Sequence, residues 1–179
     1  MSVITIISPL DDTAIESLRA GDRVVLDGIV YTARDRAHQR IAEMAERGEP
    51  VPFPAKGAII YYAGPSPTPP GKITGAAGPT TSSRMDPFTG AMLRLGVKGL
   101  IGKGRRSTEV RQLLAEHRAV YFATYGGAAA YLAARIVAAE PVAFPELGPE
   151  AVYRYEVRGF PLIVANDIHN GDVYEAALR

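Results

Sequence analysis

The order of apolar runs and glycine-rich breaks between residues 57 and 139 constrains the fold of this chain most strongly. Short apolar runs with the length of buried strands occupy residues 57–63, 97–101 and 119–123. Helical patterns follow them, beginning at Asp86-Pro87 and at Ser107, and an alanine-rich helix is expected over residues 128–139. Strands that alternate with helices in this way are typical of an α/β domain whose sheet is at least partly parallel.

Strand-like runs with few helices between them flank this region and predict an added antiparallel β element. They lie at residues 3–7, 24–32, 142–144, 151–157 and 160–165. Asp27-Gly28 indicates either a turn between two strands or a bulge within one bent strand. Two helices are expected here, at residues 13–19 and 33–47.

The segment 64–71 contains four prolines. It is neither a helix nor a central strand, because proline lacks the backbone donor and has a fixed φ. Two interpretations fit this composition, an ordered loop or a flexible linker between two domains. Since 179 residues are the length of one domain, we expect residues 1–179 to form a single domain.

Composition excludes several functional classes. The chain has no cysteine, which excludes disulfides, thiolate zinc sites and an iron–sulfur cluster held by its own side chains. A net charge of +1 gives no electrostatic basis for binding nucleic acid or an anionic membrane. The first residues lack the basic and apolar regions of a signal peptide, and no apolar run is long enough to span a bilayer. We therefore expect a cytoplasmic protein.

Residues 75–86 have the composition of an anion-binding loop. They combine small residues, which let a ligand approach the backbone, with serine and threonine hydroxyls and with Arg84. A guanidinium group is a planar fork that suits a carboxylate or a phosphate. Arg34 and Lys103 also follow expected strands, and ligands of α/β sheets bind beyond the carboxyl ends of strands. Three converging cations predict a site for a small polyanion such as a dicarboxylate.

Purely structural roles remain open for the same residues. Arg34 and His38 lie four positions apart near a helix start, where the helix dipole favours anions. In a structural role, Arg34 would pair with a nearby carboxylate and His38 would be a hydrogen-bonded polar residue. Lys103 would then be a solvated loop lysine.

Motifs of other classes do not fit. Residues 96–103 resemble a Walker A motif, but five residues rather than four separate its glycines, and no serine or threonine follows Lys103. No Gly-x-Gly-x-x-Gly follows an expected strand, and Gly-x-Ser-x-Gly is absent. His38, His117 and His169 are too scattered for a credible metal site.

Seven short motifs occur in a fixed order along nearly the whole chain. They are Arg34-Asp35-Arg36-Ala37-His38, Tyr61-Tyr62-Ala63-Gly64-Pro65, Gly78-Pro79-Thr80-Thr81-Ser82-Ser83-Arg84-Met85-Asp86, Ile101-Gly102-Lys103-Gly104, Gly126-Gly127-Ala128-Ala129-Ala130, Gly148-Pro149-Glu150-Ala151 and Phe160-Pro161-Leu162-Ile163-Val164. This ordered set resembles the β subunit, or C-terminal domain, of the iron–sulfur-dependent class I fumarate hydratase and L-tartrate dehydratase family. The resemblance implies a swivelling β/β/α domain, which agrees with a partly parallel sheet that carries helices and an added antiparallel β element.

The resemblance also implies roles for individual residues. Arg34, Arg84 and Lys103 would bind substrate carboxylates, Thr80 would transfer a proton at the reacting carbon, and His38 would have an orienting role. In this family the site lies between this domain and an α domain, whose cysteines hold a [4Fe–4S] cluster. The expected function is therefore that of a β subunit in a heteromeric hydro-lyase that interconverts fumarate and L-malate. The cluster would belong to a partner α subunit, and this chain would contribute no metal ligand.

Other functions remain compatible with the sequence. An L(+)-tartrate dehydratase β subunit would act on a substrate with one more hydroxyl, and no residue here selects for or against that group. A non-catalytic module that binds dicarboxylates would use the same three cations. A structural subunit would use none of them.

Overall fold

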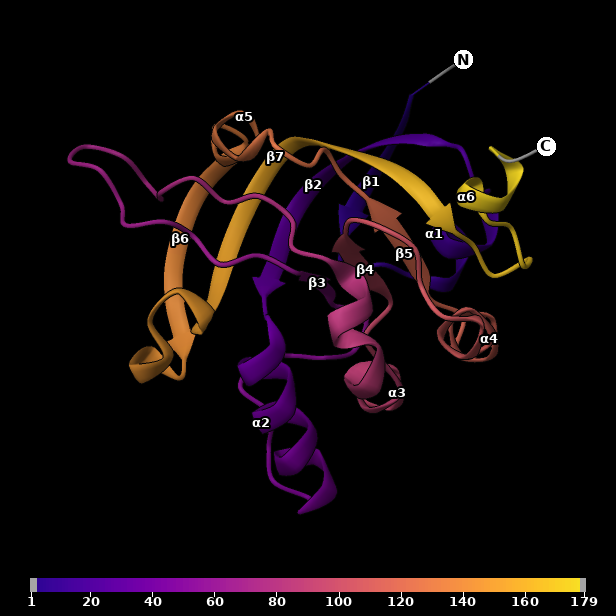
Figure 1. Cartoon of the computed structure of the whole chain (residues 1–179), viewed down its shortest axis with the longest axis horizontal. Helices are drawn as coiled ribbons and strands as arrows, with labels where there is room; N and C mark the ends of the chain where they lie inside the picture. Colours follow the sequence, from indigo (N-terminus) through magenta and orange to yellow (C-terminus); the bar gives the residue numbers. More distant parts are fainter. Residues whose placement is uncertain (1–2, 178–179) are drawn as a thin grey trace.

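The computed structural model describes residues 3–177, in which strands and helices alternate over most of the length (Figure 1). The strands are β1 (Ile4–Ser8), β2 (Arg23–Thr32), β3 (Ile59–Tyr61), β4 (Gly99–Gly102), β5 (Val120–Ala123), β6 (Ile136–Ala143) and β7 (Val152–Asn166). The α-helices are α1 (Asp12–Ser17), α2 (Asp35–Glu46), α3 (Asp86–Arg94), α4 (Thr108–Glu116), α5 (Ala129–Ala133) and α6 (Val173–Ala176). Two 3₁₀ segments occupy Ser82–Met85 and Pro145–Glu150.

Five of the strands close into a ring. β2, β3, β4 and β5 pair in parallel in that order, and β7 pairs antiparallel with both β5 and β2. β1 lies parallel to the first half of β2, and β6 lies antiparallel to the first half of β7, so both extend the sheet outside the ring (Figure 1). This mixed sheet with added antiparallel strands confirms the predicted swivelling β/β/α fold class.

The residues of β3 alternate between two hydrophobic cores. Ile59 and Tyr61 belong to the core inside the ring, to which α1 and α5 also contribute. Ile60, and Tyr62 directly after the strand, belong to an outer core that packs against α2, α3 and α4, which lie on one side of the parallel strands (Figure 1). Successive strand side chains point to opposite faces, so a strand buried on both faces has the continuous apolar sequence seen here.

The two flanking strand regions are longer than the sequence pattern suggested. β2 is one strand whose register with β7 shifts between Leu26 and Gly28, which confirms the bulge alternative for Asp27-Gly28. The Asp27 carboxylate accepts a hydrogen bond of 2.7 Å from the backbone N–H of Gly159. β7 continues through Gly159, so the strands expected at 151–157 and 160–165 are a single strand.

The alanine-rich helix expected over residues 128–139 is wrong beyond residue 133. α5 ends at Ala133, and β6 starts at Ile136 as an edge strand paired with β7. Alanine exceeds other ordinary residues in helix propensity by only about 0.7 kcal/mol or less per position, so pairing with β7 overrides it. Pro141 is tolerated in β6 because an edge strand has one side without ladder partners.

The proline-rich segment is a loop that returns to its own starting point. Ser66 donates a backbone hydrogen bond of 3.0 Å to Ala76, and the Ser66 hydroxyl accepts one of 2.9 Å from the Ala76 N–H. These two bonds close the loop at the start of the polar stretch 75–86. None of the helices within residues 3–177 is long and apolar enough to cross a membrane.

Candidate functional site

The carboxyl ends of β2, β3 and β4 bring the predicted site residues to one edge of the sheet. Arg34 follows β2, and Lys103 follows β4. Thr80 is held at the end of β3, because its N–H donates a 2.7 Å hydrogen bond to the Tyr62 carbonyl. The next turn is attached to β4 through a 2.9 Å hydrogen bond from the Ser82 N–H to the Lys103 carbonyl. The topology therefore assembles residues that are far apart in the sequence.

Arg84 lies on the 3₁₀ turn Ser82–Met85, and its guanidinium group already binds a carboxylate. Its Nε and Nη2 atoms donate to the two oxygens of Asp35, at 3.0 and 2.9 Å. This side-on arrangement leaves the outer edge of the fork, formed by Nη1 and Nη2, available to a second anion. The Arg84 side chain is half exposed, so a ligand can reach that edge.

Arg34 is the N-cap residue of α2 and lies between two backbone segments. Its Nε atom is 3.5 Å from Glu150 Oε1, an ion pair without a hydrogen bond, and this buried Nε has no other partner among the described residues. A Cβ atom at Gly64 would lie 3.1 Å from the Arg34 side chain and 2.6 Å from the Pro149 carbonyl. Glycine is therefore required at position 64 for the arginine to lie beside the end of β3.

His38 is fully buried beneath Arg34. Its Nδ1 atom is 2.9 Å from the Arg34 carbonyl, which can only accept, so Nδ1 carries the proton in a neutral ring. Burial, together with the positive charge of Arg106, lowers the pKa of His38 to about 4. Nε2 is buried and has no partner among residues 3–177. The contact with Arg34 is consistent with the predicted orienting role and makes His38 an unsuitable acid near neutral pH.

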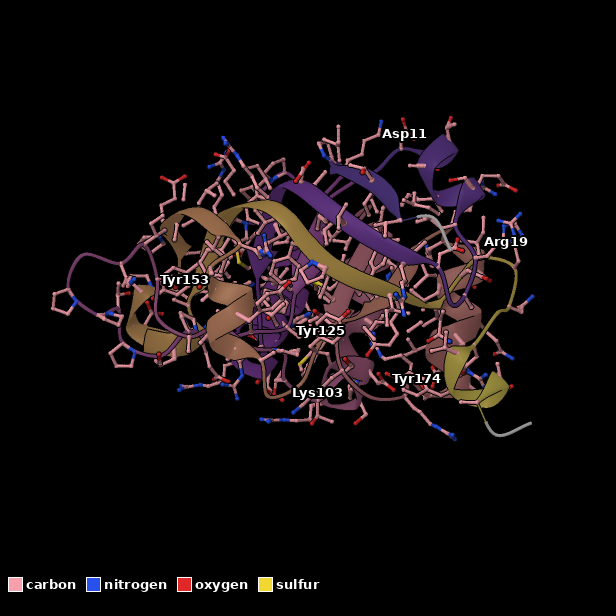
Figure 2. All side chains as sticks on the ribbon, turned by 90° about the horizontal axis from the view of Figure 1, so that it is seen from above. Asp11, Arg19, Lys103, Tyr125, Tyr153 and Tyr174 are labelled. Atoms are coloured by element: carbon pink, nitrogen blue, oxygen red, sulfur yellow. The ribbon has the colours of Figure 1, made fainter. Side chains whose placement is uncertain are left out.

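Thr80 and Lys103 have free functional groups. Within the described part of the chain, neither the Thr80 hydroxyl nor the Lys103 ammonium group forms a hydrogen bond or ion pair. Lys103 is exposed on the side of the fold away from Asp11, and it lies close to Gly126 (Figure 2). Thr80 is half-buried and precedes the 3₁₀ segment Ser82–Met85.

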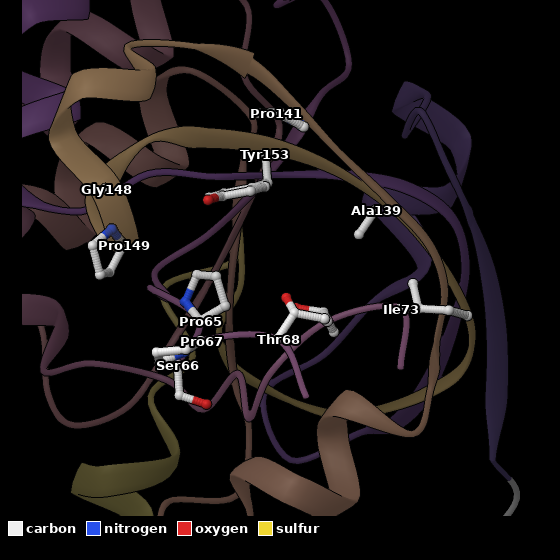
Figure 3. A pocket seen from close by; sticks show the side chains of 11 residues that line it. Pro65, Ser66, Pro67, Thr68, Ile73, Ala139, Pro141, Gly148, Pro149 and Tyr153 are labelled. Carbon is white, nitrogen blue, oxygen red and sulfur yellow. The ribbon is translucent and has the colours of Figure 1, made fainter. Parts of the chain in front are cut away.

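The charged residues form a surface edge, and a neighbouring cavity is separate from them. A cavity of about 400 Å³ lies between the proline-rich loop, the Gly148-Pro149 turn and the strands β6 and β7 (Figure 3). None of the five predicted site residues lines it. Arg34, Arg84 and Lys103 therefore lie at the edge of the sheet and outside this cavity.

Three charged residues near this edge were not singled out from the sequence. Asp35 and Glu150 are the carboxylates that pair with Arg84 and Arg34. Arg106 is buried and binds Asp86 through Nε at 2.7 Å. Asp35 and Glu150 both lie within the motifs that carried the family resemblance, and this was the available signal. The sequence of the basic run 103–106 does not distinguish the buried arginine from its exposed neighbours.

Comparison with known proteins identifies the family of this chain. The family model described as "Fumarase C-terminus" matches residues 2–177. Fumarate hydratase 2 of Leishmania major is 42% identical over 160 residues, which cover 88% of this chain and 28% of that protein. The putative L(+)-tartrate dehydratase subunit beta of Methanocaldococcus jannaschii is 40% identical over 167 residues, which cover 90% of this chain and 86% of that protein.

The aerobic class I fumarate hydratase of Escherichia coli K12 is 37% identical over 155 residues, which cover 86% of this chain and 28% of that protein. The chain thus spans little more than a quarter of these fumarate hydratases but most of the tartrate dehydratase subunit. The match over residues 2–177 and the identities near 40% show that the chain belongs to the fumarase C-terminus family.

Proposed function

We propose that this chain is the β-type subunit of a hydro-lyase that interconverts fumarate and L-malate. The observation that carries the proposal is the placement of Arg34, Arg84, Lys103 and Thr80 at one edge of the sheet. Two guanidinium groups and one ammonium group suit the two carboxylates of a four-carbon dicarboxylate.

The reaction fits the groups that this chain supplies. Dehydration of L-malate removes a proton from the carbon beside one carboxylate and releases the hydroxyl from the neighbouring carbon as water. Negative charge grows on the adjacent carboxylate as the C–H bond breaks, and cationic donors aimed at that carboxylate stabilise the transition state. Arg84 and Lys103 would provide this stabilisation, while Arg34 would fix the second carboxylate and hence the orientation of the substrate.

Thr80 is the residue in this proposal that would move the proton. Its hydroxyl has no other hydrogen-bond partner among the described residues, and its backbone is bonded to Tyr62 at the same edge of the sheet to which Arg34 and Lys103 belong. A threonine hydroxyl is a weak base at its ordinary pKa, so it needs this cationic surrounding or a relay to a stronger base. A Thr80→Val substitution, which keeps the shape and removes the hydroxyl, is the direct check of that role.

An iron–sulfur cluster does not fit the residues of this chain. The sequence contains no cysteine, and no group of three or more metal-binding side chains occurs among residues 3–177. In the proposal, the [4Fe–4S] cluster belongs to a partner α subunit, and no step assigned to this chain's residues depends on it. The site at the edge of the sheet needs such a partner to enclose the substrate.

The relatives support a separate partner. This chain covers only about a quarter of the fumarate hydratases, so most of their residues lie outside the matched region. It covers 86% of a protein whose name describes it as a β subunit. The proposed complex therefore contains this chain and a cluster-bearing α subunit.

The test is anaerobic reconstitution with the α subunit, followed by turnover measurements with fumarate and with L-tartrate. Hydration of fumarate by the complex, and by neither chain alone, supports the proposal. Preference for L-tartrate would assign the chain to the L(+)-tartrate dehydratase β subunits, which the Methanocaldococcus relative favours. Activity on neither substrate would refute both enzymes. Tight binding of malate to this chain alone, measured by calorimetry, would then support a non-catalytic binding module.

A further inference from the structure

A buried arginine links the two loops that carry the proposed site residues. Arg106 is 5% exposed, and all three nitrogens of its guanidinium group are used. Nε donates to Asp86 Oδ1 at 2.7 Å, Nη2 donates to the Thr89 hydroxyl at 2.7 Å, and Nη1 donates to the Tyr62 hydroxyl at 3.2 Å. The rings of Tyr62 and Tyr121 flank the charge, with their centroids 5.4 and 5.0 Å away.

Asp86 extends this contact to the backbone that follows Lys103. Its second oxygen, Oδ2, accepts a 3.0 Å hydrogen bond from the Ser107 N–H. Asp86 also begins α3, directly after the turn that carries Arg84. The Asp86–Arg106 pair therefore joins the end of the Thr80–Arg84 loop to the end of the Lys103 loop.

A second buried contact joins the same loops closer to the site. The Tyr121 hydroxyl is 2.9 Å from the Ser82 hydroxyl and donates a 2.7 Å hydrogen bond to the Gly104 carbonyl. Burial raises the pKa of Tyr121, so this phenol remains protonated and able to donate. The loops approach so closely that a Cβ atom at Gly102 would lie 2.0 Å from the Ser82 hydroxyl.

We propose that Arg106 and Tyr121 are positioning residues that hold Lys103 and the Thr80–Arg84 loop in the geometry needed for dicarboxylate turnover. A buried ion pair is a weak source of stability, because desolvation offsets much of its attraction. The three hydrogen bonds of Arg106, one from each guanidinium nitrogen, instead fix one relative placement of the two loops. This inference rests on the proposed function, since it concerns the same site.

The test uses the complex of this chain with its α subunit and compares Tyr121→Phe with Asp11→Ala. Tyr121→Phe keeps the ring beside Arg106 and removes only the hydroxyl that binds Ser82 and Gly104. Asp11→Ala removes a helix-capping hydrogen bond of 2.7 Å at the start of α1, on the side away from Lys103 (Figure 2). Both variants lose buried or capping hydrogen bonds, and both are expected to melt a few degrees below the wild type.

We expect Tyr121→Phe to raise KM for L-malate and to lower kcat/KM at least tenfold, because displacement of catalytic groups by about 1 Å can cost a hundredfold in rate. Asp11→Ala should keep the wild-type kcat and KM. Arg106→Lys keeps the charge but not the three-way fork, and it should show the same loss if it folds.

Equal kcat and KM in Tyr121→Phe and Asp11→Ala would overturn the inference and leave the proposed function intact. Failure of the proposed function is distinguishable, because the wild-type complex would then turn over neither fumarate nor tartrate.

Discussion

Substitution of Arg84 by alanine should separate activity from stability. The Arg84 side chain is 50% exposed and that of Asp35 is 28% exposed. Ion pairs of this kind contribute only about 0–1 kcal/mol, because solvent screens them. Asp35 also remains in the first turn of α2, where the helix dipole favours a carboxylate by roughly 0.3–1 kcal/mol. The free energy of unfolding should therefore fall by about 1 kcal/mol or less, which lowers Tm by about 2–4 °C in a domain of this size.

The effect on turnover should be much larger. Removing one donor that stabilises transition-state charge typically costs about 2.7–4 kcal/mol, or about 10²–10³ in kcat. The assay is dehydration of L-malate by the reconstituted complex, at a temperature well below Tm, with circular dichroism melting of the same preparations. Because about 1 kcal/mol leaves a protein of ordinary stability folded, unfolding cannot account for a hundredfold loss.

Arg47→Ala is the matched control. Arg47 also binds a carboxylate side-on, through Nε and Nη2 to Glu49 at 2.6 and 3.3 Å, and it lies at the opposite end of α2. It should lose as little stability as Arg84→Ala and retain full turnover. If Arg84→Ala keeps kcat/KM within about threefold of this control, Arg84 is not a transition-state ligand and the reasoning is refuted.

Three further outcomes are expected. His38 has a pKa lowered from 6.5 to about 4, so the stability that its neutral form gives the fold is complete above pH 6.5 and is lost as pH falls towards 4. The free energies of unfolding of the wild type and of His38→Asn, measured with denaturant at each pH, should therefore become closer by about 3 kcal/mol over that range. Lys103→Met should lower kcat/KM about 10²-fold. It should change the free energy of unfolding by no more than about 0.5 kcal/mol, since the ammonium group has no partner among residues 3–177. An unchanged kcat/KM would show that Lys103 does not belong to the site. Gly102→Ala should lower the free energy of unfolding by about 1–3 kcal/mol, because the added Cβ atom would overlap the Ser82 hydroxyl. A thermal melt with the wild-type Tm would show that the two loops are less closely packed.

The local sequence pattern predicted the strands that are buried on both faces. β3, β4 and β5 are continuous apolar runs because both faces are covered, and α4 has a serine cap that accepts from the Val110 N–H. The local pattern failed at Ala138 and Ala139, which favour a helix by propensity but lie on an edge strand paired with β7. The pairing partner is a separate segment of the chain, so no local pattern contains it.

In the candidate site, too, the local pattern predicted some residues and missed the partners that come from distant parts of the chain. Arg34, Arg84 and Lys103 could be predicted together because parallel strands bring their carboxyl ends to one edge. Their partners could not, because Asp35 and Arg84 are 49 residues apart and meet only in the folded chain. The structural role considered for Arg34, pairing with a carboxylate, is observed, since Glu150 Oε1 lies 3.5 Å from its Nε atom.

The measurement that tests the proposed site most directly is an experimental structure of the complex with its α subunit and bound L-malate. We expect one substrate carboxylate to lie within hydrogen-bonding distance of the outer edge of Arg84 and of Lys103, and the other to contact Arg34, with the Thr80 hydroxyl next to the carbon that loses its proton. Malate bound entirely by the α subunit, with Arg84 and Lys103 facing solvent, would contradict the account.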